Sequence, residues 1–214
     1  GGYSWTTTSN CFNPVAADPT FSFAYSQQYY WTVKAVNSYS SSTTAAPRSF
    51  VIESDPTIYS YPWIENFDSV SAGSMPHRWT VIASQNYGNS IPGWTATPNV
   101  GCYSEPHAAV AYAAWPAPKN EWMMTVPFSM QAGQTYNISF MVIAPRRGPV
   151  AEDFAVYHGA EPTVDAMTAN PALFTNDQTS YDDWTRVTFS FTPPSTGSYY
   201  FGWHAYSPTD LNQI

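Results

Sequence analysis

Two acidic side chains stand three residues apart in the segment YPWIENFDSV, residues 61–70. Carboxylates can serve in acid–base catalysis or hold a metal ion, and they can also be ordinary solvated residues. The apolar residues around Glu65 and Asp68 favour a further interpretation, in which WIENF is the first strand of a domain. The type of site therefore depends on the chemical groups and elements that accompany the two acids.

The other candidate catalytic groups do not form a recognisable constellation. The adjacent acids Glu152–Asp153 and Asp182–Asp183 cannot flank one glycosidic bond, because neighbouring side chains of a strand point to opposite faces. No HExxH, GxSxG or paired Cys/His signature accompanies the histidines, which are His77, His107, His158 and His204. We therefore assign no catalytic residue and expect a protein that is not an enzyme.

The composition indicates an all-β chain. Thr, Val, Ser, Tyr, Phe and Trp are abundant, and only Leu173 and Leu211 are leucines. Seven basic residues against fifteen acidic ones give a net charge of -8, which disfavours a nucleic-acid partner. No apolar run approaches the roughly eighteen residues of a membrane span. Cys11 and Cys102 lack the spacing of metal ligands, and they could pair only if the two halves of the chain packed closely.

The first part of the chain contains a half-buried antiparallel strand, YYWTVKAVN, in which Tyr29, Trp31 and Val33 share one face. It resembles strand F of a fibronectin type III domain, with Tyr29 as the tyrosine-corner residue and RSFVI as the last strand. Such a domain needs about 100 residues. We therefore expect residues 1–52 to be a partial fibronectin type III sandwich whose opening strands are missing. The polar, proline-bearing residues 53–61 indicate a linker.

Residues 62–214 show the pattern of a β-sandwich or jelly roll. Many short apolar runs are separated by Gly, Pro, Asn and Asp turns. In TYNISFMV and TRVTFSF, every second side chain is apolar, which predicts strands with one buried face. Only TVDAMTAN, residues 163–170, is typical of a short helix, with Thr163 or the preceding proline at its start and Asp165 in its first turn.

The order of motifs in this second part resembles the MAM-like jelly-roll modules, also called cleaved-adhesin or choice-of-anchor domains, of large secreted bacterial proteins. The segments that carry the resemblance are PWIENFDSV, MPHRWTV, NEWMMTVPFSMQAGQTYNISFMV, EDFAVYHG, WTRVTFSF and GSYYFGWHAYS. The resemblance implies a structural calcium site to which Glu65 and Asp68 contribute. It also implies a closing strand with an acidic pair beyond Ile214, so we expect this strand to be missing and the calcium site to be incomplete.

These observations lead to the hypothesis of a non-catalytic adhesion and spacer module at the outside of a bacterial cell. Its partner would be a protein or glycan ligand, together with neighbouring modules or another chain. The alternative is a carbohydrate-binding module attached to a glycan-degrading or proteolytic enzyme, because jelly rolls often bind sugars on aromatic side chains. Trp94 and Trp115 border proline-rich loops, so we expect them to be exposed and to be the ligand-binding residues.

Overall fold

A computed structural model of the chain describes residues 3–9, 11–36, 39, 42–83, 93–98, 101–111, 118–144, 152–176 and 180–207. The chain divides into two compact units, Gly1–Asp55 and Pro56–Ile214. The elements are nearly all β-strands, which confirms the prediction of an all-β fold with a jelly-roll sandwich.

The first unit consists of two antiparallel strand pairs and a short helix. Strand β1 (Gln28–Trp31) pairs with β4 (Arg48–Val51), and β2 (Lys34–Val36) pairs with β3 (Ser42–Thr44). The short helix α1 (Pro14–Ala17) begins after Asn13, whose side chain accepts hydrogen bonds from the next turn.

Aromatic rings hold the first unit together. Phe21 is buried, and Phe23 makes edge contacts with the rings of Phe21, Tyr29 and Phe50. The Tyr29 hydroxyl accepts a hydrogen bond of 2.7 Å from the Ala24 N–H, five residues earlier. A contact of this type forms a tyrosine corner, while the assignment to fibronectin type III stays a prediction.

Part of the segment interpreted as a linker lies against the second unit. The Ile58 N–H donates to the Pro127 carbonyl, and the Ser129 N–H donates to the Ile58 carbonyl, each over 2.9 Å. The Tyr61 hydroxyl donates to the Ser129 carbonyl over 2.9 Å. Residues 56–61 are therefore built into the second unit.

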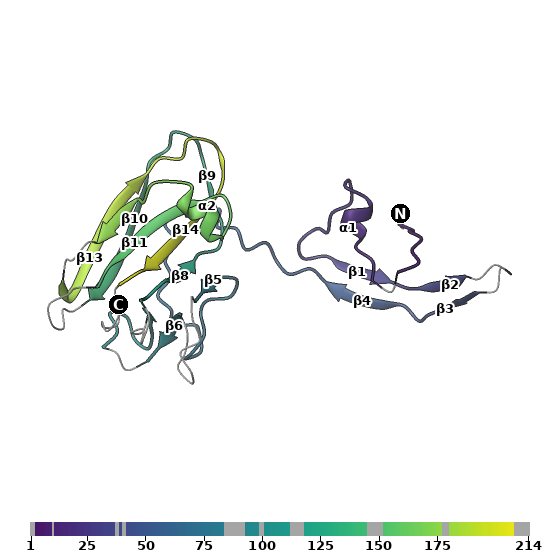
Figure 1. Ribbon diagram of the computed structural model, residues 1–214, viewed down its shortest axis with the longest axis horizontal. Coiled ribbons are helices and arrows are strands. Elements are labelled where there is room, and N and C mark those ends of the chain that lie inside the picture. The colour runs from purple at the N-terminus through teal and green to yellow at the C-terminus, as the bar shows by residue number, and fades with distance from the viewer. Residues whose placement is uncertain are drawn as a thin grey trace. The chain divides into compact units, whose positions relative to one another are not determined.

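The larger layer of the second unit is an antiparallel sheet with the strand order β12-β11-β14-β8-β5, in which β9 also pairs with β14 (Figure 1). Its strands are β5 (Thr80–Ile82), β8 (Glu121–Met124), β9 (Phe128–Met130), β11 (Phe154–Gly159), β12 (Phe174–Asn176) and β14 (Gly197–Ala205).

The opposing layer contains the long strands β10 (Tyr136–Ala144) and β13 (Tyr181–Phe191), which pair with each other. Their alternation places Phe140 and Val187 in a buried cluster with Phe154 and Met123 of the larger sheet, as the sequence pattern predicted. A hairpin of β6 (Trp94–Thr97) and β7 (Ala108–Ala111) also contributes to this core. The two layers are therefore joined by one apolar interior.

The expected short helix is present as α2 (Val164–Thr168), on the side of the larger sheet away from this interior. Thr163 is its N-cap and accepts a hydrogen bond from the Ala166 N–H. The helix lies so close to β11 that a Cβ on Gly159 would stand 3.0 Å from the Ala166 backbone. A side chain at this position would therefore require the helix to shift by a few tenths of an ångström.

Candidate functional site

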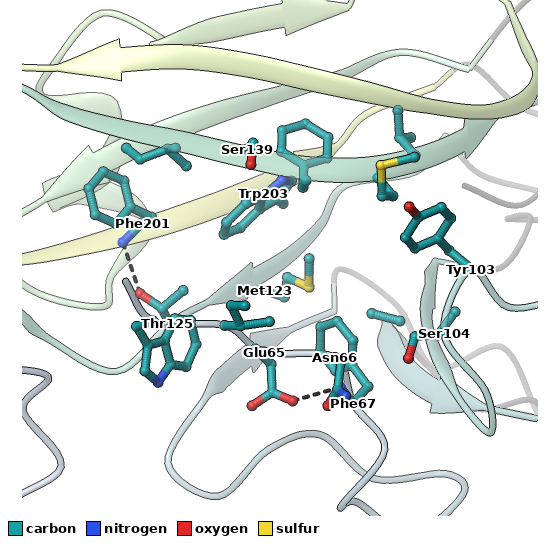
Figure 2. Close-up of a pocket in the computed structure, with 18 of the residues that line it drawn as sticks. Glu65, Asn66, Phe67, Tyr103, Ser104, Met123, Thr125, Ser139, Phe201 and Trp203 are labelled. Atoms are coloured by element: carbon teal, nitrogen blue, oxygen red, sulfur yellow. Dashed lines mark hydrogen bonds between the residues drawn. The ribbon is translucent and has the colours of Figure 1, made fainter. Parts of the chain in front are cut away.

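An open groove of about 1530 Å³ lies between the two layers of the second unit. Inward side chains of the larger sheet, among them Met123, Phe201 and Trp203, form its floor (Figure 2). Strand β10 lines one side, and residues 61–67 line the other. The groove therefore has an apolar lining, in which Trp203 is half-buried while Met123 and Phe201 are buried beneath it.

The main chain of β10 borders this groove. Every residue from 135 to 143 contributes to the lining. Because successive side chains of a strand point to opposite faces, a continuous run of lining residues means that the edge of the strand faces the groove. Within the described part of the chain, β13 is the only strand paired with β10. The other edge of β10 is thus placed to accept main-chain hydrogen bonds.

Residues 61–67 form the opposite side of the groove. The Trp63 ring contacts Phe128 edge-on, with ring centroids 5.2 Å apart, and the Phe67 ring contacts Trp79. Ile64 is 81% exposed. This side of the groove therefore carries apolar side chains, of which Ile64 is available to a ligand.

Glu65 and Asp68 lie in the turn that ends this segment. A Glu65 carboxylate oxygen accepts a hydrogen bond of 2.7 Å from the Phe67 N–H (Figure 2). Asp68 accepts hydrogen bonds from the side chains of Asn66 and Ser104. Over the residues that the structure describes, no group of three or more His, Cys, Asp or Glu side chains could hold a metal ion. The two acids alone are a poor calcium site, because calcium takes roughly six to eight oxygen ligands.

We propose that Glu65 and Asp68 still contribute to a weak calcium site. Millimolar calcium is then expected to raise the Tm of the chain by about 2–4 °C, which corresponds to roughly 1 kcal/mol for a protein of this size. EDTA should reverse the shift, and Asp68→Ala should abolish it, whereas the exposed Asp182→Ala should not. A thermal unfolding curve that calcium leaves unchanged would show that both acids only stabilise the turn.

Of the two tryptophans expected to bind ligand, the structure describes only Trp94. Trp94 is only 5% exposed, and its indole N–H donates to the Glu121 carbonyl over 3.3 Å. The expectation that it is exposed is wrong, because the β6–β7 hairpin packs it into the core. Its ring nevertheless lines the groove, so its role in binding stays a prediction. Trp115 lies outside the described residues.

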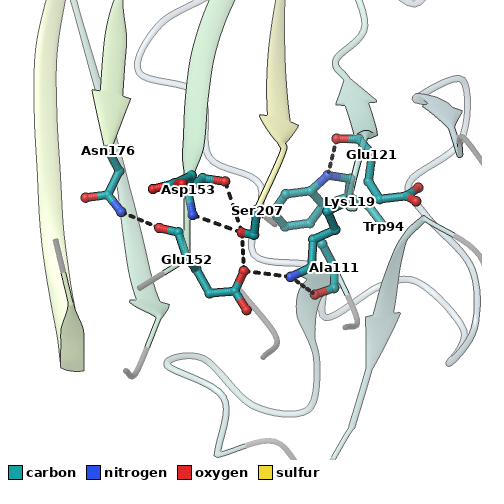
Figure 3. Close-up of polar contacts among 8 residues, drawn as sticks. All are labelled: Trp94, Ala111, Lys119, Glu121, Glu152, Asp153, Asn176 and Ser207. Carbon is teal, nitrogen blue, oxygen red and sulfur yellow. Dashed lines mark hydrogen bonds and ion pairs between the residues drawn. The ribbon is translucent and has the colours of Figure 1, made fainter. Parts of the chain in front are cut away.

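A buried ion pair that the sequence analysis missed lies at one end of the sandwich (Figure 3). The Lys119 ammonium is 2.9 Å from a Glu152 carboxylate oxygen, and both side chains are 1% exposed. Lys119 also donates to the Ala111 carbonyl over 3.4 Å, and the Ser207 hydroxyl donates to Glu152. Burial lowers the pKa of the Lys119 ammonium, while the Glu152 charge opposes that shift. The network joins β7, β8 and the ends of β11 and β14, so its role is structural.

The outer face of the larger sheet carries a group of aromatic rings, on the side of β14 opposite the core residues Trp203 and Ala205. The His204 ring stacks on Trp122 with centroids 4.1 Å apart and an angle of 8°. A His204 ring nitrogen hydrogen-bonds to the Asn120 side-chain oxygen over 2.7 Å. Tyr157 and Tyr206 complete the group, which we call the outer aromatic face.

Both cysteines, Cys11 and Cys102, are free thiols in this structure.

Glu152 and Asp153 are buried, whereas Asp182 and Asp183 are exposed and Asp182 accepts a hydrogen bond from Ser180. One acid of each adjacent pair, Glu152 and Asp182, therefore makes side-chain contacts within the fold. No described helix has the length and apolar character needed to cross a membrane.

The fold is a β-sandwich that is also found in adhesin domains of known structure. The chain is similar to the K1 cleaved adhesin domain of Lys-gingipain from Porphyromonas gingivalis W83, with 16% identity and a TM-score of 0.52, covering 70% of this chain and 90% of that one. The K2 domain of Lys-gingipain gives 14% identity, a TM-score of 0.52 and the same coverage. At these identities the likeness establishes the fold.

A further solved structure, of carbohydrate-binding modules from the β-sandwich superfamily, has 12% identity and a TM-score of 0.43, over 88% of this chain and 70% of that one. No protein-family model matches the sequence, and no curated protein does.

Proposed function

We propose that the chain is a non-catalytic adhesion and spacer module of a large secreted or surface-attached bacterial protein. The observation that carries this proposal is the open apolar groove between the layers of the second unit. A groove of this volume is large enough for a specific ligand, since binding sites typically measure about 300–1,000 Å³. The adhesin domains with the same fold support the surface location, and two compact units in series suit a spacer.

The test compares binding by two isoleucine variants. Purified chain is expected to bind at least one member of an array of extracellular proteins and glycans saturably. Ile64→Lys places a charge beside the groove and should weaken this binding several-fold, because a charged group is costly to bury. Ile82→Lys is the matched control: Ile82 is 37% exposed and belongs to β5, outside the groove. Surface plasmon resonance measures both affinities.

Two outcomes would contradict this proposal. If the chain binds nothing on the array, the adhesion function is wrong. If Ile64→Lys retains full affinity while both variants keep the wild-type Tm, the ligand does not occupy the groove.

The alternative function, a carbohydrate-binding module of a larger enzyme, is favoured by the outer aromatic face. Tyr157, His204 and Tyr206 are half-buried rings, and Asn120 is an exposed amide beside them. Rings of this kind can stack on sugar while an amide bonds its hydroxyl groups. Tyr206→Ala is then expected to weaken glycan binding several-fold, corresponding to about 1 kcal/mol. Glycan binding that responds to Tyr206→Ala and not to Ile64→Lys would decide for this alternative.

A further inference from the structure

We propose that the groove accepts an extended segment of a partner protein, which pairs with the free edge of β10 as an added β-strand. The inference rests on the binding function proposed above and names the chemistry of the partner. Two properties of the groove carry the argument: a main-chain edge on one side and an apolar floor beneath it.

The edge of β10 requires hydrogen-bonding partners. In an antiparallel ladder, alternate residues direct their N–H and C=O groups to one neighbour, and the residues between them direct theirs to the other side. Strand β10 pairs with β13 through Tyr136–Val142 and Ala144, so its alternate main-chain groups are directed toward the groove. A sugar cannot match this regular row of donors and acceptors along its length. An extended polypeptide does so, because it presents the same groups at the same spacing.

The floor requires apolar side chains. Ile138 and Phe140 of β10 are half-buried, and the half-buried Trp203 of β14 contributes the opposing side chain. An added strand that carries an apolar residue at every second position would direct those residues onto the floor and its polar residues outward. The same segment therefore satisfies both the edge and the floor.

The charges favour a different protein over a second copy of this chain. Among the residues that the structure describes, the groove lining contains one acidic and one basic side chain, Glu65 and Arg186. The chain carries a net charge of -8, and two copies repel each other. A neutral or basic segment of another protein is not repelled by this net charge.

The probe is a synthetic nine-residue peptide in which valine and threonine alternate between two terminal lysines, matched in length to β10. We expect saturable binding to the full chain by isothermal titration calorimetry. A peptide of the same composition with its valines grouped together should bind at least about tenfold more weakly, because it cannot direct them to one face. Ile138→Lys should weaken binding of the alternating peptide by a similar factor. Thr188→Lys, at an exposed position of β13 that does not belong to the groove lining, is the control and should change it less than about twofold.

Backbone pairing is tested without altering the protein. The valine amides and the threonine amides of the peptide point to opposite edges of a strand. Methylating either set alone should therefore abolish binding for one set and spare it for the other. Hydrogen exchange should also show new protection at alternate amides of Tyr136–Ala144 when the peptide is bound.

Three results would overturn the inference. The first is no binding of the alternating peptide to the unaltered chain. The second is binding that neither methylated peptide loses and that protects no amide of β10, which would indicate apolar contact alone. The third is a dimer of this chain that the peptide cannot dissociate, which would place a second copy in the groove. Array binding that is lost in Ile64→Lys and not displaced by the peptide would refute only the added strand and leave the adhesion function intact.

Discussion

Glu152→Ala is expected to lower the free energy of unfolding of the second unit by about 3–5 kcal/mol, because it removes the carboxylate that forms the ion pair with the buried Lys119 ammonium. Both side chains are 1% exposed, so water cannot replace the lost partner. The Ser207 hydroxyl also loses Glu152 as an acceptor and, as a donor, keeps the longer hydrogen bond, of 3.4 Å, to the Asp153 carbonyl. Lys119→Met should cost a similar amount, since it leaves the Glu152 charge without the ammonium.

The double variant Lys119→Met with Glu152→Leu should be more stable than either single variant, because neither member of the ion pair is left without the other. Urea denaturation followed by circular dichroism measures all three variants. Lys34→Met, at an exposed position of β2, is the control and should change stability by less than about 0.5 kcal/mol. If Glu152→Ala is no more costly than the control, the ion pair does not stabilise the fold.

Sequence patterns predicted the individual strands and the helix of this fold better than the pairing of the strands. Alternation in residues 136–142 and 185–191 identified strands β10 and β13 and their inward faces, because the period of a strand is a local property. The short helix α2 was predicted from its N-cap at Thr163 for the same reason. The strand order of the larger sheet depends on contacts between distant segments, which a single sequence does not contain.

The candidate site was harder to predict from the sequence, because contacts between distant segments determine which of its side chains are buried. Trp94 was expected to be exposed because it follows a loop, but β7 and the larger sheet cover its ring. Lys119 is one of two lysines in the chain and directly precedes an apolar strand, yet its burial becomes visible only beside Glu152, 33 residues later. The groove has no sequence signal of its own, because segments that are distant in the sequence line it, among them β10 and residues 61–67. The prediction of a missing closing strand remains untested.

Lowering the pH from 6.5 to 4 is expected to destabilise the second unit through His204. Burial beside Trp122 lowers the pKa of His204 from 6.5 to about 4. Between these values the unfolded chain binds a proton that the folded chain does not, so the free energy of unfolding falls as the pH falls through this window. The full shift would correspond to roughly 3 kcal/mol, and the partial exposure of the ring reduces our expectation to about 1–2 kcal/mol.

The variant His204→Phe separates this contribution from that of the carboxylates. Phenylalanine can keep the stack on Trp122 but cannot take up a proton, so the variant should lose about 1–2 kcal/mol less than the wild type between pH 6.5 and 4. Tyr206→Phe alters the adjacent ring and retains the histidine, and it should keep the wild-type dependence on pH. Urea denaturation at a series of pH values measures the three profiles. Parallel profiles for His204→Phe and the wild type would mean that the His204 ring is protonated as readily in the folded chain as in the unfolded one.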